Sequence, residues 1–168
     1  MNSIAVFCGS ALGTDTIFAE QARLTGELIA KAGKTLVYGG GRSGLMGIVA
    51  DSALAAGGKV IGVIPQGLAD KELAHPDLTE LYVVQDMHQR KTKMSELSDA
   101  FIALPGGSGT LEEIFEQWTL AQLGIHLKPC AFLNINGFYD DLIRFIDVTA
   151  TKGFTKSRFS EALIYSNR

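Results

Sequence analysis

The sequence is poor in cysteine, has no surplus of basic residues and contains no long apolar run. Its two cysteines, Cys8 and Cys130, are far apart and have no neighbours at metal-site spacing, so we expect reduced core thiols and no metal. The net charge of −3 argues against bulk attraction to nucleic acid or to a membrane surface. No stretch reaches the roughly 18 apolar residues of a membrane-spanning helix, and no charged leader precedes the first apolar run. These absences predict a cytoplasmic protein that acts on a small molecule.

Two common nucleotide motifs are also missing or incomplete. No G-x-x-x-x-G-K-[ST] loop occurs, which argues against the corresponding ATP or GTP hydrolysis. Gly39, Gly41 and Gly44 have G-x-G-x-x-G spacing, but they follow the second predicted strand, and the interval 59–67 lacks the expected carboxylate. NAD is therefore disfavoured, and we expect no cofactor. These glycines indicate either close packing or a backbone that approaches a ligand.

What the sequence does contain is a regular alternation of short apolar runs with helical patterns. Its 168 residues, 46% of them apolar, predict one α/β domain spanning residues 1–168. The predicted strands are 3–7, 35–38, 59–64, 81–84, 100–104 and 130–134. Such alternation is typical of a doubly wound, Rossmann-like parallel sheet with helices on both faces. We expect the segment 66–80 to be irregular and able to fold over a site, and the tail from Gly153 to dock through Phe154, Phe159, Leu163 and Ile164.

One stretch, Pro105 to Glu113, carries the strongest functional signal. Three glycines within four residues follow a predicted strand and precede a helical pattern, so backbone N–H groups can approach a ligand at a helix start. This arrangement predicts an anion site, most simply for phosphate. The alternative is a capping box between Thr110 and Glu113, which have the required spacing. A capping box leaves the run of glycines unexplained, because one glycine suffices for a turn.

A second stretch, DMHQRK, opens another predicted helix with Asp86 as its cap. Arg90 and Lys91 lie near the N-terminal end of that helix, where cations oppose the helix dipole. They indicate either a solvated basic face or a nearby anion. Glu113 would repel a phosphate directly, but a carboxylate there could stabilise the positive charge that develops on a ribose when an N-glycosidic bond breaks. The three histidines have no metal-type spacing and are interpreted as structural.

Together, PGGSGTLEE, YGGG and DMHQRK resemble the Lonely Guy (LOG) family of cytokinin riboside 5′-monophosphate phosphoribohydrolases, often mislabelled as lysine decarboxylases. AQLGIH and NINGFYDDL extend the resemblance towards the C-terminus. The resemblance implies that Arg90 and Glu113 are catalytic. The nucleotide contacts that it implies are Glu72, Arg90, Lys91, Gly107, Ser108, Gly109, Thr110, Leu111, Glu112, Glu113 and Thr119.

The expected reaction is hydrolysis of a nucleoside 5′-monophosphate to free base and ribose 5-phosphate, with a cytokinin riboside monophosphate or AMP as substrate. A broader purine or pyrimidine nucleotide nucleosidase and a non-catalytic carrier of a nucleotide-like cofactor are the alternatives. Lysine decarboxylation ordinarily needs a pyridoxal phosphate Schiff base, and nothing marks a lysine for it. A homodimer is expected, from the resemblance and from apolar residues on more than one face of the helix after the glycine loop. These residues are Trp118, Leu120, Ala121, Leu123 and Ile125.

Overall fold

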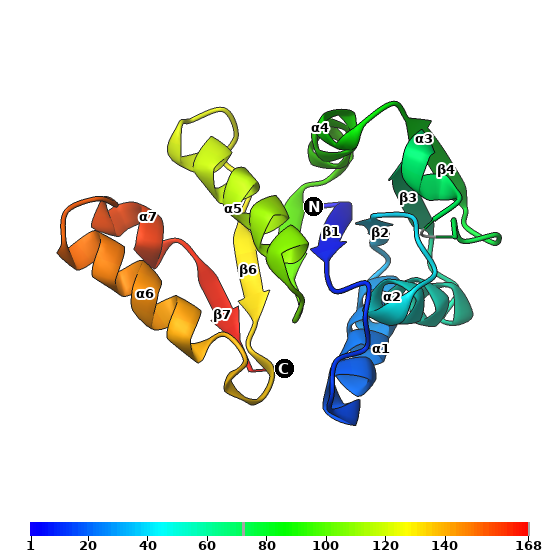
Figure 1. Cartoon of the computed structure of the whole chain (residues 1–168), viewed down its shortest axis with the longest axis horizontal. Coiled ribbons are helices and arrows are strands. Elements are labelled where there is room, and N and C mark those ends of the chain that lie inside the picture. Colours follow the sequence, from blue (N-terminus) through cyan, green and yellow to red (C-terminus); the bar gives the residue numbers. More distant parts are fainter. Residues whose placement is uncertain (72, 168) are drawn as a thin grey trace.

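The computed structural model describes residues 1–71 and 73–167, and within these ranges the chain forms one seven-stranded parallel sheet (Figure 1). The strands are β1 (Ser3–Phe7), β2 (Thr35–Tyr38), β3 (Val60–Pro65), β4 (Glu80–Val84), β5 (Ala100–Ala103), β6 (Cys130–Leu133) and β7 (Ile164–Ser166). Their order across the sheet is β4-β3-β2-β1-β5-β6-β7, and every pair of neighbours is parallel. The predicted doubly wound α/β fold is confirmed.

Helices cover both faces of the sheet because its central strands are apolar on both sides. On β1, Val6 points into a core shared with α1 (Thr16–Lys31) and α2 (Gly44–Ala55), whereas Ala5 and Phe7 point to the opposite core. The opposite core is covered by α4 (Met87–Leu97), α5 (Ser108–Gln122), α6 (Asp140–Thr151) and α7 (Ser157–Glu161). Two short helical pieces, α3 (Gln66–Ala69) and η1 (Ile135–Gly137), lie in connections. None of the helices within the described ranges is long and apolar enough to cross a membrane.

The C-terminal segment differs from its prediction. Instead of a tail that docks through isolated apolar residues, it forms α7 and then β7, which pairs with β6 at the edge of the sheet. Leu163 is buried as expected, but Phe154 is 89% exposed and does not dock. A three-residue strand is too short to show an alternating pattern in the sequence, so β7 could not be recognised.

The segment between β3 and β4 lies against the glycine turn that follows β2. The His75 N–H donates to the Gly40 carbonyl at 2.9 Å, and the Arg42 N–H donates to the Leu73 carbonyl at 3.2 Å. The His75 ring, nearly fully buried, lies 2.5 Å from an Asp51 carboxylate oxygen on α2. Apart from α3, an isolated antiparallel bridge between Gly41 and Ala74, and Glu80 at the start of β4, the described part of 66–80 is irregular, as predicted.

Candidate active site

The turns that follow β1, β2 and β5 meet at one edge of the sheet. These strands are adjacent and parallel, so their carboxyl ends lie side by side, where such sheets bind ligands. A cavity of about 300 Å³ opens there. The residues that line it are Val6, Phe7, Cys8, Gly9, Ser10, Gly39, Met46, Met87, Arg90, Gly107, Ser108, Gly109, Thr110 and Glu113.

The glycine loop ends in the N-terminus of α5, which faces this cavity. The first i→i−4 bond of the helix runs from the Leu111 N–H to the Gly107 carbonyl, at 3.2 Å, so the amides of residues 108–110 precede the helical ladder. Gly107 and Gly109 are exposed, and a methyl group added to either would meet no described atom within 4 Å. Open amides at a helix start suit an anion.

The capping-box prediction is wrong. Gly107 is the N-cap of α5 and makes no side-chain capping bond, while Thr110 lies inside the helix and is buried. The N-cap of the helix lies three residues earlier than the spacing of Thr110 and Glu113 suggests. Glu113 is thereby left one turn into the helix, where it lines the cavity.

A further glycine of the loop is needed for packing. A methyl group at Gly106 would lie 2.7 Å from Thr110 Cβ and 3.0 Å from the Gly9 nitrogen. The Gly9 N–H donates to the Pro105 carbonyl at 3.1 Å, which joins the turn after β1 to the loop after β5. Close approach of these two turns therefore explains a glycine that a simple turn does not require.

Arg90, on α4, lines the cavity and is fixed from two sides. Its side chain is buried, its Nε donates to the Val63 carbonyl at 3.0 Å, and a terminal nitrogen donates to the Gly39 carbonyl. These carbonyls belong to β3 and to the turn after β2, so the guanidinium spans two strands. Of the two interpretations of the basic run, the solvated face is wrong for Arg90.

The packing around the turn after β2 explains why two of its residues are glycine. A methyl group at Gly39 would overlap the Arg90 guanidinium and lie 2.7 Å from Met46 Cε. Gly44 has a φ of +57°, and a methyl group there would lie 2.5 Å from the Ala11 nitrogen. Close packing therefore explains Gly44, whereas Gly39 lines the cavity and makes room for Arg90.

Glu113 adds negative charge to the cavity that Arg90 also lines. Burial raises the pKa of the Cys8 thiol well above its ordinary value, and the nearby Glu113 carboxylate raises it further. Cys8 therefore stays a neutral thiol and is not an activated nucleophile. The cavity thus combines a carboxylate, a buried guanidinium and the open amides of a helix start.

Other predicted contact residues lie outside the cavity. The Lys91 ammonium is 2.7 Å from Glu112 Oε1 and 2.8 Å from Glu116 Oε2. Leu111 packs against the core, and Thr119 is exposed farther along α5. Glu72 lies outside the described residues. The nucleotide contacts of these residues remain predictions.

Two methionines of the cavity were not predicted from the sequence. Met87 belongs to the DMHQRK stretch, so its position could have been suspected from its neighbour Arg90. Met46 begins an apolar helix, and in the sequence it cannot be distinguished from an ordinary core residue.

Comparison with known proteins places the chain among described relatives. Residues 46–168 match the profile of a family described as "Possible lysine decarboxylase". A cytokinin riboside 5′-monophosphate phosphoribohydrolase of Rhodococcoides fascians is 52% identical over 161 residues, which cover 93% of this chain and 81% of the relative. One of Arabidopsis thaliana is 47% identical over 161 residues, covering 96% of this chain and 75% of the relative.

Solved structures share the fold at much lower identity. The molybdenum cofactor binding protein of Rippkaea orientalis superposes with a TM-score of 0.72 at 22% identity, covering 98% of this chain and 88% of that one. The Moco carrier protein of Chlamydomonas reinhardtii gives the same values. At this identity the likeness shows a common architecture only.

Proposed function

Because this chain belongs to the Lonely Guy family of cytokinin riboside 5′-monophosphate phosphoribohydrolases, we propose that it hydrolyses the N-glycosidic bond of a nucleoside 5′-monophosphate. The products are the free base and ribose 5-phosphate. The substrate is a cytokinin riboside monophosphate, that is, an adenine nucleotide substituted on its exocyclic amine, or AMP. The observation that carries the proposal is the presence of Arg90, Glu113 and the N-terminal amides of α5 in one cavity.

The phosphate of the substrate binds at the start of α5. Amides of residues 107–110 supply donors, and the partial positive charge of the helix N-terminus favours the dianion. Because Gly107 and Gly109 carry no side chain and have open space around them, a phosphate can approach the backbone closely. Glu113 lies one turn farther along the helix, which brings its carboxylate towards the ribose and away from the phosphate.

The C1′–N bond breaks with its electron pair moving to the base, and a water oxygen forms the new bond to C1′. Glu113 stabilises the oxocarbenium-like ribose electrostatically, orients the water and accepts its proton, while the departing base takes up one proton from solvent. Arg90 holds the substrate and offsets the negative charge near the reacting centre. Its two carbonyl acceptors fix the guanidinium before substrate arrives, so no reorientation is needed during the reaction.

The alternatives fit the site less well. A carrier needs no carboxylate beside the ribose, whereas Glu113 and Arg90 both line this cavity. Decarboxylation through a Schiff base needs a lysine at the reacting centre, and the described residues that line the cavity include no lysine. A broader nucleotide nucleosidase uses the same machinery and differs only in the base that it accepts.

We also propose a homodimer in the cytoplasm, with no nucleic acid as partner. Three apolar side chains at and beyond the end of α5 support the dimer, because they are strongly exposed in the single chain. Leu123 is 68% exposed, Ile125 65% and Leu127 92%. Apolar exposure of this kind is typical of a surface that another protein covers.

The central test measures base release from a panel of nucleoside 5′-monophosphates by wild type and by Glu113→Gln. We expect wild type to release base from substituted or plain adenine nucleotides. The amide keeps the size of Glu113 but removes its charge, so turnover should fall roughly 10²- to 10³-fold. Nucleotide binding and the unfolding midpoint should stay close to those of wild type.

Two outcomes would contradict the proposal. Wild type that releases no base from any member of the panel would exclude hydrolysis. A Glu113→Gln variant that folds, binds nucleotide and releases base at nearly the original rate would remove Glu113 from the mechanism.

A further inference from the structure

The two residues assigned to catalysis lie on different helices, and the residues next to them in the sequence join those helices. Arg90 is on α4 and Glu113 is on α5, on the same face of the sheet (Figure 1). Lys91 follows Arg90, and Glu112 precedes Glu113. Because successive residues on a helix point about 100° apart, Arg90 and Lys91 serve different surfaces. Arg90 lines the cavity, and Lys91 reaches α5.

The contact between Lys91 and α5 is double. Its ammonium lies 2.7 Å from Glu112 Oε1 and 2.8 Å from Glu116 Oε2, and these carboxylates are one helical turn apart on the same side of α5. The Lys91 side chain is only 17% exposed. The hydrogen bonds that the ammonium donates to the carboxylates of Glu112 and Glu116 raise the pKa of Lys91, so it stays charged.

A second polar link lies one turn farther along α4. The Ser95 hydroxyl donates to Gln117 Oε1 at 3.0 Å, so α4 and α5 are joined at two successive turns. The buried oxygen of Glu116 depends on Lys91 for compensation of its charge. Removing the ammonium would therefore leave two carboxylates near each other with no cation between them.

We propose that Lys91 is a positioning residue that clamps α5 to α4 and thereby sets the spacing between Arg90 and Glu113. This inference rests on the proposed function, in which those two groups act together on one ribose. It also explains the cation near the start of α4: the anion beside Lys91 is a pair of protein carboxylates. Small displacements of groups that act together can lower turnover strongly, by about 10²-fold for 1 Å.

The test compares three variants: Lys91→Met, the double variant Glu112→Gln/Glu116→Gln, and the combination of all three changes. The clamp and a direct phosphate contact by Lys91 predict opposite results. If Lys91 only clamps, both partial variants lower kcat and neither changes the Kd of ribose 5-phosphate. If Lys91 binds phosphate, freeing it from Glu112 and Glu116 tightens ribose 5-phosphate binding.

For the clamp we expect kcat to fall about tenfold or more in Lys91→Met and in the double variant, with KM within about twofold of wild type. The combined variant should be no slower than Lys91→Met or the double variant, because all three lose the same interaction between Lys91 and the two carboxylates. Lys91→Arg keeps the charge and should retain most of the activity. Circular dichroism establishes that each variant is folded.

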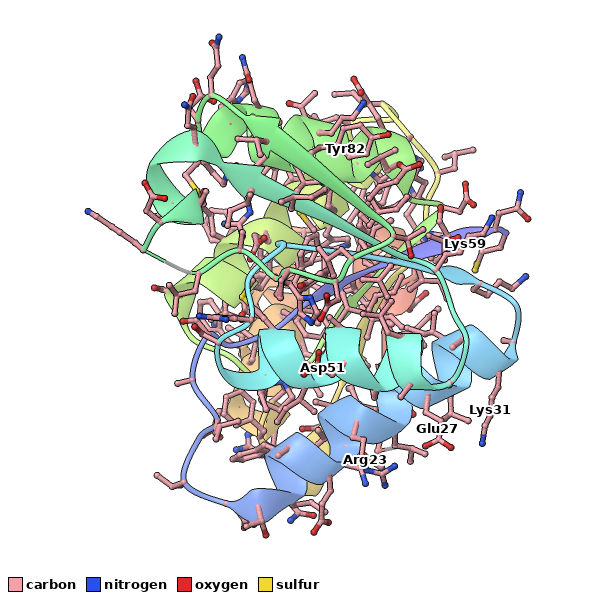
Figure 2. All side chains as sticks on the ribbon, turned by 90° about the vertical axis from the view of Figure 1, so that its right-hand side faces the viewer. Arg23, Glu27, Lys31, Asp51, Lys59 and Tyr82 are labelled. Carbon is pink, nitrogen blue, oxygen red and sulfur yellow. The ribbon has the colours of Figure 1, made fainter. Side chains whose placement is uncertain are left out.

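Glu27→Gln is the matched control. Glu27 is the centre of another three-member ion cluster, with Arg23 at 3.0 Å and Lys31 at 2.6 Å, but all three lie along α1 (Figure 2). The Glu27→Gln substitution removes the central charge of this cluster but changes no contact between two helices, so kcat should be unchanged.

Two results would overturn the clamp. One is an unchanged kcat in Lys91→Met. The other is weaker binding of ribose 5-phosphate by Lys91→Met together with tighter binding by the double variant. If wild type itself releases no base, the proposed function fails, but melting temperatures still decide on the clamp. Losses of melting temperature that are non-additive between Lys91→Met and the double variant support the clamp, and additive losses reject it.

Discussion

Gly39 occupies the space next to the Arg90 guanidinium, so the smallest possible substitution tests how that guanidinium is placed. In Gly39→Ala the methyl group meets the ends of two flexible side chains, Arg90 and Met46, which can shift at modest cost in stability. The shift moves Arg90 in the cavity, so we expect kcat/KM to fall about 10-fold or more while the unfolding midpoint changes little. Steady-state kinetics and urea unfolding measure the two effects.

Gly67→Ala is the control for this substitution. Gly67 lies in α3, where an added methyl group would meet no described atom within 4 Å, and activity should stay at the wild-type level. A Gly39→Ala enzyme as active as wild type would show that Arg90 tolerates displacement.

At this scale the sequence predicts the type of chemistry better than the contacts. The glycine run and its helix start could be interpreted correctly because close backbone approach has few other causes. The burial of Arg90 could not be foreseen, since its acceptors, Val63 and Gly39, lie 27 and 51 residues away in the chain. Lys91 looked equivalent to Arg90 for the same reason: only the packing of α4 against α5 distinguishes them.

The connection between α5 and β6 contains a histidine whose protonation opposes folding. His126 Nδ1 accepts from the Lys128 N–H at 3.1 Å, so the neutral ring has its proton on Nε2, 3.2 Å from Gln117 Oε1. Burial, and then the Lys128 charge, lower the pKa of His126 below its ordinary 6.5. Protonation of Nδ1 would break the bond to the backbone.

The sign of the pH effect follows from this lowered pKa. Below about pH 6.5 the unfolded chain takes up a proton that the folded chain binds only at lower pH, so folding becomes less favourable as pH falls through that window. We expect wild type to lose more unfolding free energy between pH 7.5 and 5 than His126→Gln, which cannot titrate. Urea unfolding at both pH values measures this, and equal losses would contradict it.

The sequence predicts the amphipathic helices and the buried strands to within a few residues, but it misses β7. The amphipathic α1 and α6 and the buried strands β1, β2 and β5 carry clear patterns. β7 has only three residues, two of them exposed, and pairs with a strand about thirty residues earlier. The capping-box alternative fails because the N-cap of α5 is Gly107 and not Thr110.

At the scale of the whole molecule, the exposed end of α5 predicts the assembly state. We expect wild type to sediment as a dimer at micromolar concentration and Leu127→Glu to sediment as a monomer, because a charge cannot be buried unpaired in an apolar interface. Val83→Glu, on the edge strand β4 at the other side of the sheet, is the control, since Val83 is 55% exposed. Wild type that sediments as a monomer would contradict the prediction.

The strand order has a consequence for the sequence of events in folding. β1 is the first of the seven strands in sequence order but lies inside the sheet, with β2 to β4 on one side and β5 to β7 on the other. The first group can pair while one edge of β1 stays open, and the second group closes that edge only after residues about 95 positions later have joined it. The cavity spans this seam, with Gly39 on one side and Gly107 on the other. If the proposed substrate binds in this cavity, it contacts both halves of the sheet, and we expect it to stabilise the closed sheet against unfolding.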